Sequence, residues 1–102
     1  MIFLMALLLQ VLVANAGTDV SVRFGHRLSV DAPGYVPIQG TAKGGSFIWA
    51  IPARSPGIVA DPKRLRTHLI VTETGLHRVW LIVSNGRDIK TDEVLIIVEG
   101  AP

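Results

Sequence analysis

The stretch TETGLHRVWLIVSNG, residues 72–86, decides the fold of this chain. Between Gly75 and the pair Asn85–Gly86, two sets of side chains alternate with a period of two, which is the period of a β-strand. Glycine and Asn-Gly are typical of tight turns, so the strand has a marked beginning and end. One set is His77, Val79, Leu81 and Val83, and the other is Leu76, Arg78, Trp80, Ile82 and Ser84.

Outside this stretch, short apolar runs alternate with glycine, proline, asparagine and aspartate. No run keeps a helical period of apolar residues for ten positions, so the pattern predicts an all-β protein. Six or seven strands at this spacing favour a two-sheet β-sandwich with Greek-key connections. Residues 52–66 are expected to lie at the surface and to cross between the sheets. The expected strands are Asp19–Phe24, Arg27–Asp31, Ser46–Ile51, His68–Thr72, Leu76–Ser84 and Glu93–Val98.

The order of four segments, VSVRFGHRLSVDA, GSFIWAI, TETGLHRVWLIVSNG and TDEVLIIV, resembles the polycystic-kidney-disease (PKD) domain and its immunoglobulin-like relatives. The resemblance covers about Asp19–Val98. It implies that Trp49 is a core tryptophan on the third strand and that the set with Val79 points inward, which leaves the set with Trp80 on the outer face. Two features depart from the family: AIPARSPG replaces an acidic, glycine-rich turn, and His77 stands in the tyrosine position. Such domains are usually extracellular spacers, adhesion units or accessory modules, which the resemblance implies for this chain.

Length and composition limit the classes of protein that this chain can belong to. A chain of 102 residues has room for one domain, with Gly17 to Pro102 as its sandwich part. There is no cysteine, which excludes disulfides, zinc–thiolate sites and thiol nucleophiles. Ten Lys and Arg against eight Asp and Glu are too balanced to predict nucleic-acid binding.

The first 16 residues carry no charged side chain and end in Ala14-Asn15-Ala16. An apolar run followed by a small-x-small site is typical of a secretory signal peptide, with Gly17 as the mature N-terminus. As a membrane-spanning helix, Met1 to Ala14 would rise only about 21 Å, short of a hydrocarbon core of about 30 Å. The remaining alternative is a retained apolar segment that packs as a strand or against another subunit.

No residue pattern in the chain predicts catalysis. The three histidines, His26, His68 and His77, lack the spacing of a zinc site, and His77 is expected to be a buried, hydrogen-bonded core residue. The acidic residues near the last turn, Asp88, Asp92 and Glu93, favour solvated turn charges over a calcium site. The chain is therefore predicted to be no enzyme and to need no metal or other cofactor.

One face of the predicted sandwich is too apolar for contact with water. If the third, penultimate and last strands lie side by side, their outward side chains gather into one apolar patch, unless bulges change the faces or residues 52–66 cover it. The last strand, Val94–Val98, would also pair with another strand if it were a bare edge. The predicted interface residues are Ile48, Trp80, Ile82, Leu95 and Ile97.

These features predict a secreted or envelope-surface, structural or adhesive module that acts through protein assembly, for example as a virion or filament subunit. A protein partner or self-association is expected, with membrane contact only transiently through the N-terminal segment. The alternative is an accessory module whose basic loop binds a glycan or another anion, although no aromatic residue is interleaved with its charges. The predicted anion-binding residues are Arg54, Lys63, Arg64 and Arg66.

Overall fold

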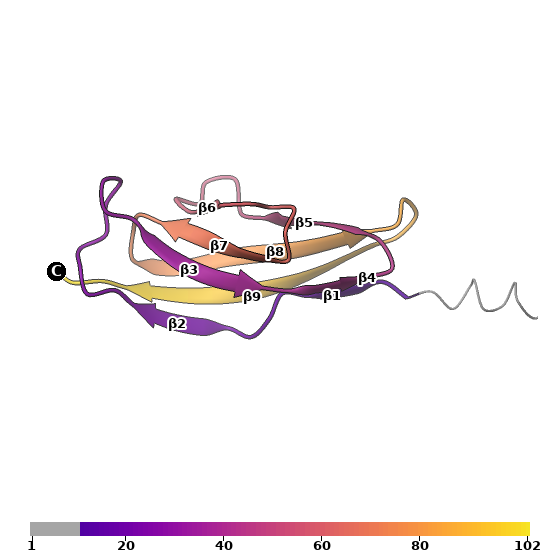
Figure 1. Cartoon of the computed structure of the whole chain (residues 1–102), viewed down its shortest axis with the longest axis horizontal. Helices are drawn as coiled ribbons and strands as arrows, with labels where there is room; N and C mark the ends of the chain where they lie inside the picture. Colours follow the sequence, from indigo (N-terminus) through magenta and orange to yellow (C-terminus); the bar gives the residue numbers. More distant parts are fainter. Residues whose placement is uncertain (1–10) are drawn as a thin grey trace, which may run out of the picture.

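The computed structural model describes residues 11–102, and these residues form strands and connecting loops without a helix (Figure 1). The segment 1–10, which belongs to the predicted signal peptide, lies outside the described residues. The strands are β1 (Val13–Asn15), β2 (Val20–Arg23), β3 (Gly34–Gln39), β4 (Thr41–Lys43), β5 (Ser46–Ala50), β6 (Ile58–Val59), β7 (Arg66–Val71), β8 (Gly75–Ser84) and β9 (Ile89–Glu99).

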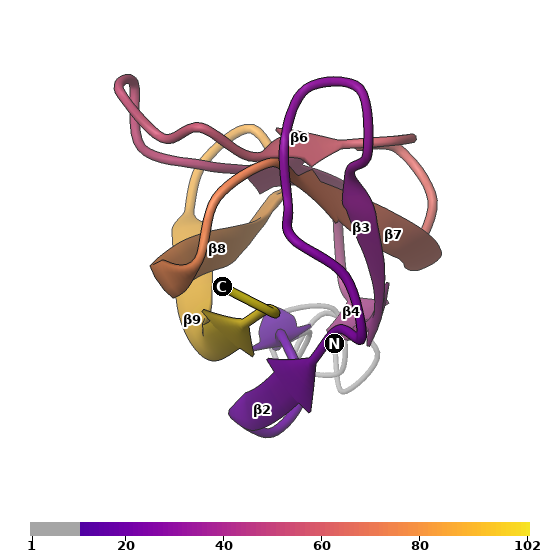
Figure 2. The same cartoon turned by 90° about the vertical axis from the view of Figure 1, so that its left-hand side faces the viewer.

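Two sheets face each other across the core (Figure 2). One has four strands in the order β2-β9-β8-β5, and the other has three in the order β3-β7-β6. A short ladder joins β1 to β4, which follows β3 directly after Gly40. The first part of the chain thus pairs with two different strands: β1 lies antiparallel to β4, and β2 lies parallel to β9. This arrangement is an immunoglobulin-like, Greek-key β-sandwich, as the sequence predicts.

The core lies between the inward faces of the two sheets. The inward set predicted for β8 is buried completely except for His77, which is almost so. Trp49 is buried as predicted, and its indole Nε1 donates a hydrogen bond to the carbonyl oxygen of Arg64 at 2.8 Å. The other large core residues are Leu12, Leu28, Val36, Ile38, Leu69, Val71, Val94, Ile96 and Val98.

One predicted strand is wrong. Residues Arg27–Asp31 form a loop, in which Ser29 and Ala32 exchange backbone hydrogen bonds at 3.1 and 3.2 Å. This tight loop satisfies its own backbone groups, so the segment pairs with no strand, and Val30 is 83% exposed. The next strand along the chain is β3, which the sequence pattern did not predict.

Pro37 explains why the sequence pattern did not predict β3. A proline in the middle of a run argues against a central strand because it has no N–H for the ladder. In the structure β3 is an edge strand that pairs with β7, and Pro37 lies opposite His68. An edge strand tolerates proline, and here the proline also makes the open edge a poorer template for pairing with other chains.

The last strand does not lie at the edge of its sheet. Val94–Val98 therefore offers no unpaired edge for pairing with another chain. β9 lies between β8 and β2, and Val20 pairs with Ile96 in a parallel ladder. At the upstream end of this ladder, the Asp19 carboxylate accepts a hydrogen bond from the Leu95 backbone N–H at 2.9 Å. The backbone of the segment is therefore paired within its own domain.

The region 52–66 crosses from one sheet to the other, as predicted, and contains the short strand β6. It leads from the edge strand β5 of the four-stranded sheet to β6 and β7 of the other sheet. The Trp49 backbone N–H donates to the carbonyl oxygen of Pro62 at 2.8 Å. Part of the free edge of β5 is thereby covered.

Residues 11–16 are built into the sandwich. Leu12 and Ala16 are buried with the core, and β1 pairs with β4 from Val13–Lys43 to Asn15–Thr41. The Ala16 backbone N–H donates to a carboxylate oxygen of Asp92 at 2.7 Å. These contacts favour the retained-segment alternative for this part of the chain, while cleavage after Ala16 stays a prediction.

Replacing Gly45 with alanine is expected to lower the free energy of unfolding by about 1 to 3 kcal/mol. A Cβ at this position would overlap the carbonyl oxygen of Ser84 and lie 2.6 Å from its carbonyl carbon, and backbone atoms cannot rotate away. Gly25→Ala is the matched control because a Cβ there meets nothing within 4 Å. Urea denaturation of both variants tests the expectation, and equal stabilities would contradict it.

Candidate interaction surface

The outer face of the four-stranded sheet carries all five predicted interface residues. Cross-strand pairing sets Ile48 opposite Ile82, while Trp80 lies opposite Glu93 and Leu95 opposite Arg78. Leu76, which shares its alternating set with Trp80 but is not among the predicted interface residues, lies opposite Ile97. We call the six apolar residues the outer strip: Ile48, Leu76, Trp80, Ile82, Leu95 and Ile97.

The outer strip is open to solvent at both of its ends. Leu76 and Ile97 are 54% and 49% exposed at one end, and Ile48 is exposed at the other. Trp80, Ile82 and Leu95 are half-buried among their neighbours. Exposed apolar side chains on neighbouring strands are a common feature of protein-binding sites.

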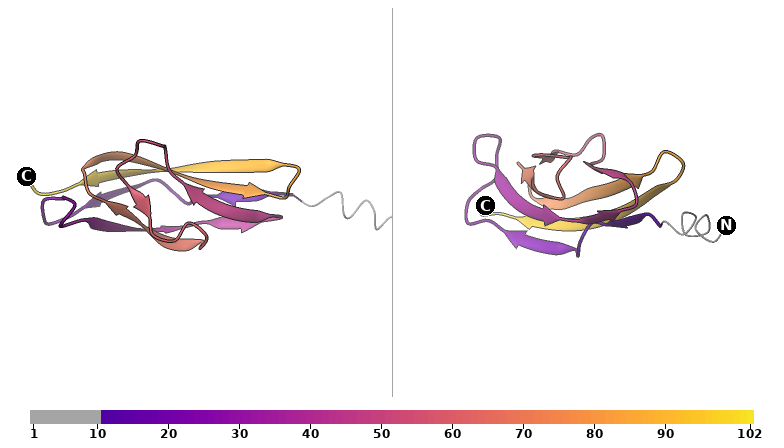
Figure 3. Two further views of the ribbon diagram at one scale, coloured as in Figure 1. Left: turned by 90° about the horizontal axis from the view of Figure 1, so that it is seen from above. Right: turned by 45° about the vertical axis from the view of Figure 1, so that its right-hand side comes forward.

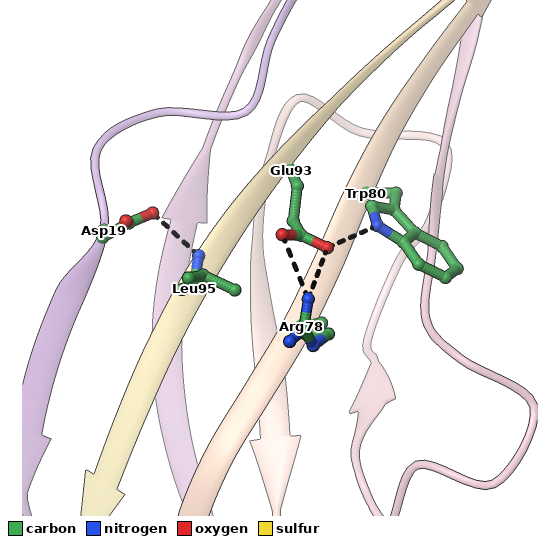
Figure 4. Close-up of polar contacts among 5 residues, drawn as sticks. All are labelled: Asp19, Arg78, Trp80, Glu93 and Leu95. Carbon is green, nitrogen blue, oxygen red and sulfur yellow. Dashed lines mark hydrogen bonds and ion pairs between the residues drawn. The ribbon is translucent and has the colours of Figure 1, made fainter.

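A polar group divides the outer strip in the middle (Figure 4). The carboxylate of Glu93 accepts a hydrogen bond from Trp80 Nε1 at 2.8 Å and is 3.4 Å from Arg78 Nη1. The indole N–H is therefore satisfied within the sheet, and the ring is fixed in place. Since Arg78 is half exposed, the ion pair adds little to folding stability, but it leaves a charged centre between two apolar ends.

The three acidic residues near the last turn do not converge, and the interpretation as solvated turn charges is wrong for two of them. β9 begins at Ile89, so Asp92 and Glu93 are adjacent strand residues that point to opposite faces. Asp92 points between the sheets toward Ala16, and Glu93 belongs to the outer face. Within residues 11–102, no three His, Asp or Glu side chains group as metal ligands.

His77 is a buried, hydrogen-bonded core residue, as predicted. Its Nε2 donates to the carbonyl oxygen of Glu73 at 3.0 Å, which assigns the proton to that nitrogen. In immunoglobulin-like sandwiches a tyrosine near the start of this strand bonds to backbone a few residues upstream, and here the histidine makes the corresponding bond. His26 and His68 are exposed and lie far apart in the fold.

The four predicted anion-binding residues are all exposed but belong to different segments. Arg54 lies in the loop before β6, whereas Lys63 and Arg64 lie in the loop after it and Arg66 begins β7. The two loops leave opposite ends of β6 (Figure 2). Binding of a glycan or another anion by these residues stays a prediction.

Comparisons with known proteins give structural matches only. No protein-family model and no curated protein matches the chain. A chimeric titin Z1Z2 carrying a KLER peptide from decorin matches with a TM-score of 0.48 and 12% identity over 89% of this chain and 99% of that one. Titin domain M7 matches with a TM-score of 0.45 and 11% identity over 87% and 92%. The closer resemblance to PKD domains stays a prediction.

Proposed function

We propose that this chain is a non-enzymatic protein-interaction module that self-associates through the outer strip. The single observation that carries this proposal is the gathering of six apolar side chains, the outer strip, on the outer face of the four-stranded sheet. The outer face of a sandwich that contacts only water is expected to be mainly polar. Here three of the five outward side chains of β8 are apolar: Leu76, Trp80 and Ile82.

The arrangement of the outer strip supports a second copy as the partner. Apolar ends flank the Arg78–Glu93 pair on both sides. A two-fold axis that crosses the strands near this pair would set the Leu76 end of one copy on the Ile48 end of the other. The same rotation would bring each arginine near the glutamate of the other copy, so both the apolar and the charged groups would be complementary.

Trp80 is the proposed anchor of this interface. Its ring offers a large apolar surface and its N–H already has a partner, so its burial against another chain leaves no polar atom unsatisfied. The proposal also includes a structural or adhesive role at a secreted or cell-envelope surface, for which the uncharged N-terminal segment of the sequence is the support.

The double variant Leu95→Lys, Ile97→Lys is expected to remain folded and to lose self-association. Both side chains point away from the core, so the added charges reach water in the monomer but would be buried in the assembly. Trp80→Ala is expected to weaken association while the domain stays folded. Sedimentation velocity over a range of concentrations measures the association, and circular dichroism checks the fold.

The matched control is Ile58→Lys, which puts a charge on an exposed apolar residue of the other sheet. This variant should associate as the wild type does. A wild-type chain that stays monomeric at the highest attainable concentration would overturn the proposal. An unfolded Trp80→Ala variant would also contradict it, because that result would give Trp80 a core role.

A further inference from the structure

A second group of side chains lies on the outer face of the three-stranded sheet, on the other side of the core from the outer strip (Figure 2, Figure 3). Buried and outward residues alternate along β3 and β7. The antiparallel register between these strands sets their outward residues side by side, because opposite residues point to the same face of a sheet. We call three outward pairs the second face: Tyr35–Ile70, Pro37–His68 and Gln39–Arg66.

The second face is polar and positively charged, in contrast to the outer strip. Gln39, Arg66 and His68 are exposed and carry hydrogen-bonding groups. The strands β3, β6 and β7 contain no aspartate or glutamate, and Arg66 takes no part in the ion pair found within residues 11–102. The nearest acid before Arg66 is Asp61, whose carboxylate accepts the backbone N–H of Lys63 at 3.1 Å. The guanidinium is therefore free to pair with an anionic ligand.

Charge changes along the length of the second face. At the end where β7 begins, the exposed cations Lys63 and Arg64 precede Arg66. At the other end, Asp31 comes before β3 and Glu73 comes after β7. An anionic group is attracted to the first end and repelled from the second, so the charges would give an elongated ligand one orientation.

Tyr35 supplies an aromatic ring at the end away from the cations. It is 58% exposed, and Ile70 beside it is half-buried. The ring offers a flat apolar surface with a hydroxyl at its rim, on which the C–H face of a sugar ring stacks well. Arg66 lies four residues along β7 from Ile70, about 13 Å at the rise of a strand. Tyr35 and Arg66 are therefore far enough apart to hold different sugar units of one chain.

We infer that the second face binds an anionic polysaccharide along β3 and β7. Tyr35 stacks on one sugar ring, His68 and Gln39 bond to hydroxyl groups, and Arg66 pairs with a carboxylate or sulfate group. An extended acidic peptide fits less well, because it would add to the open edge of β3, where Pro37 has no N–H to donate.

The inference is independent of processing and of the proposed self-association. The second face contains no residue before Tyr35, so it does not require residues 1–16. It also shares no residue with the outer strip, which belongs to the other sheet. The basic loop and Tyr35 are distant in the sequence, and only the pairing of β3 with β7 puts Arg66 and the ring on one face.

The test is isothermal titration of the chain with three probes. A heparin oligosaccharide carries sulfate groups, an oligogalacturonate carries only carboxylates, and a dextran oligosaccharide is neutral. Binding to at least one of the two anionic probes is expected, and it should weaken as salt is added. The better of the two identifies the acidic group that Arg66 prefers. Dextran should not bind measurably, because it has no anionic group for the guanidinium.

Substitutions test the two ends of the second face separately. Arg66→Gln should raise the Kd for the anionic probe about tenfold, as the loss of a hydrogen bond between charged groups does. Arg23→Gln is the matched control, because it removes an exposed arginine from β2 of the other sheet, and it should bind as the wild type does. Tyr35→Ala should also raise the Kd about tenfold, whereas Tyr35→Phe keeps the ring and should restore most of the binding. Circular dichroism checks the fold of each variant.

Three results would overturn the inference. The first is a folded wild-type chain that binds neither anionic probe. The second is an equal loss in Arg66→Gln and Arg23→Gln, since binding would then depend only on net charge. The third is binding of polyglutamate as tightly as the better glycan with no effect of Tyr35→Ala, which would identify a site for acidic peptides.

The variant Trp80→Ala separates this inference from the proposed function. It changes no charge and should weaken self-association, yet it should bind the anionic probe as the wild type does. Loss of glycan binding in this variant would place the site on the outer strip and contradict the inference. Loss of binding in Arg66→Gln with unchanged self-association would support it and leave the proposed function untouched.

Discussion

Replacing Trp49 with alanine is expected to lower the free energy of unfolding by about 3 to 5 kcal/mol, as deletion of a large buried aromatic side chain does. The ring is almost completely buried between the sheets. Its Nε1 also donates to Arg64 O, so the substitution leaves that carbonyl without its partner. Both effects act on the connection between β5 and the loop that leads to β7.

The unfolding free energy of Trp49→Ala can be measured by urea denaturation followed by far-ultraviolet circular dichroism. Trp80→Ala is the matched control, because it removes the same side chain from the outer face and should cost clearly less in the monomer. A second variant, Trp49→Phe, keeps most of the volume and removes the N–H donor, which separates packing from hydrogen bonding. A loss below about 1 kcal/mol for Trp49→Ala would be incompatible with a packed core position.

A chain that begins at Gly17 is expected to be less stable than one that begins at Val11 by about 3 to 6 kcal/mol. The deletion removes the buried side chain of Leu12, which contributes about 2 to 3 kcal/mol, and the buried Ala16. It also removes the ladder between β1 and β4 and the N–H that bonds to Asp92, each hydrogen bond contributing about 1 kcal/mol.

Denaturation of the two chains side by side provides the measurement. Equal stabilities would show that residues 11–16 are dispensable and would support processing after Ala16. The expected difference would instead mean that cleavage there removes a structural strand and opens the inward face near Trp49 and Leu81. The variant Asp92→Asn in the longer chain isolates the contribution of the carboxylate, and it should cost less than the deletion.

The sequence by itself determined which side chains share a face in the strands it located correctly. Because strand side chains alternate, residues 75–84 divide into two sets. The resemblance to PKD domains indicated that the set with Val79 and Leu81 points inward, and the structure buries that set and leaves Trp80 and Ile82 on the outer face. The same rule separated Trp49 from Ile48, and it brought the predicted interface residues to one face once β5, β8 and β9 were taken as neighbours. Alternation is a local property, whereas the choice of the inward set came from the resemblance, which covers most of the chain.

Only the tertiary structure decided which segments became strands where the local pattern was weak. Gly34–Gln39 contains a proline yet pairs with β7, whereas Arg27–Asp31 alternates well and pairs with nothing. A strand is stabilised by hydrogen bonds to a partner far away in the sequence, and the partner is unknown until the chain has folded. For the same reason, the sequence did not predict that Asp92 accepts a hydrogen bond from Ala16, a residue 76 positions earlier. It also left the small-x-small motif Ala14–Ala16 with two meanings, a cleavage site or a short strand whose small side chains fit against the core.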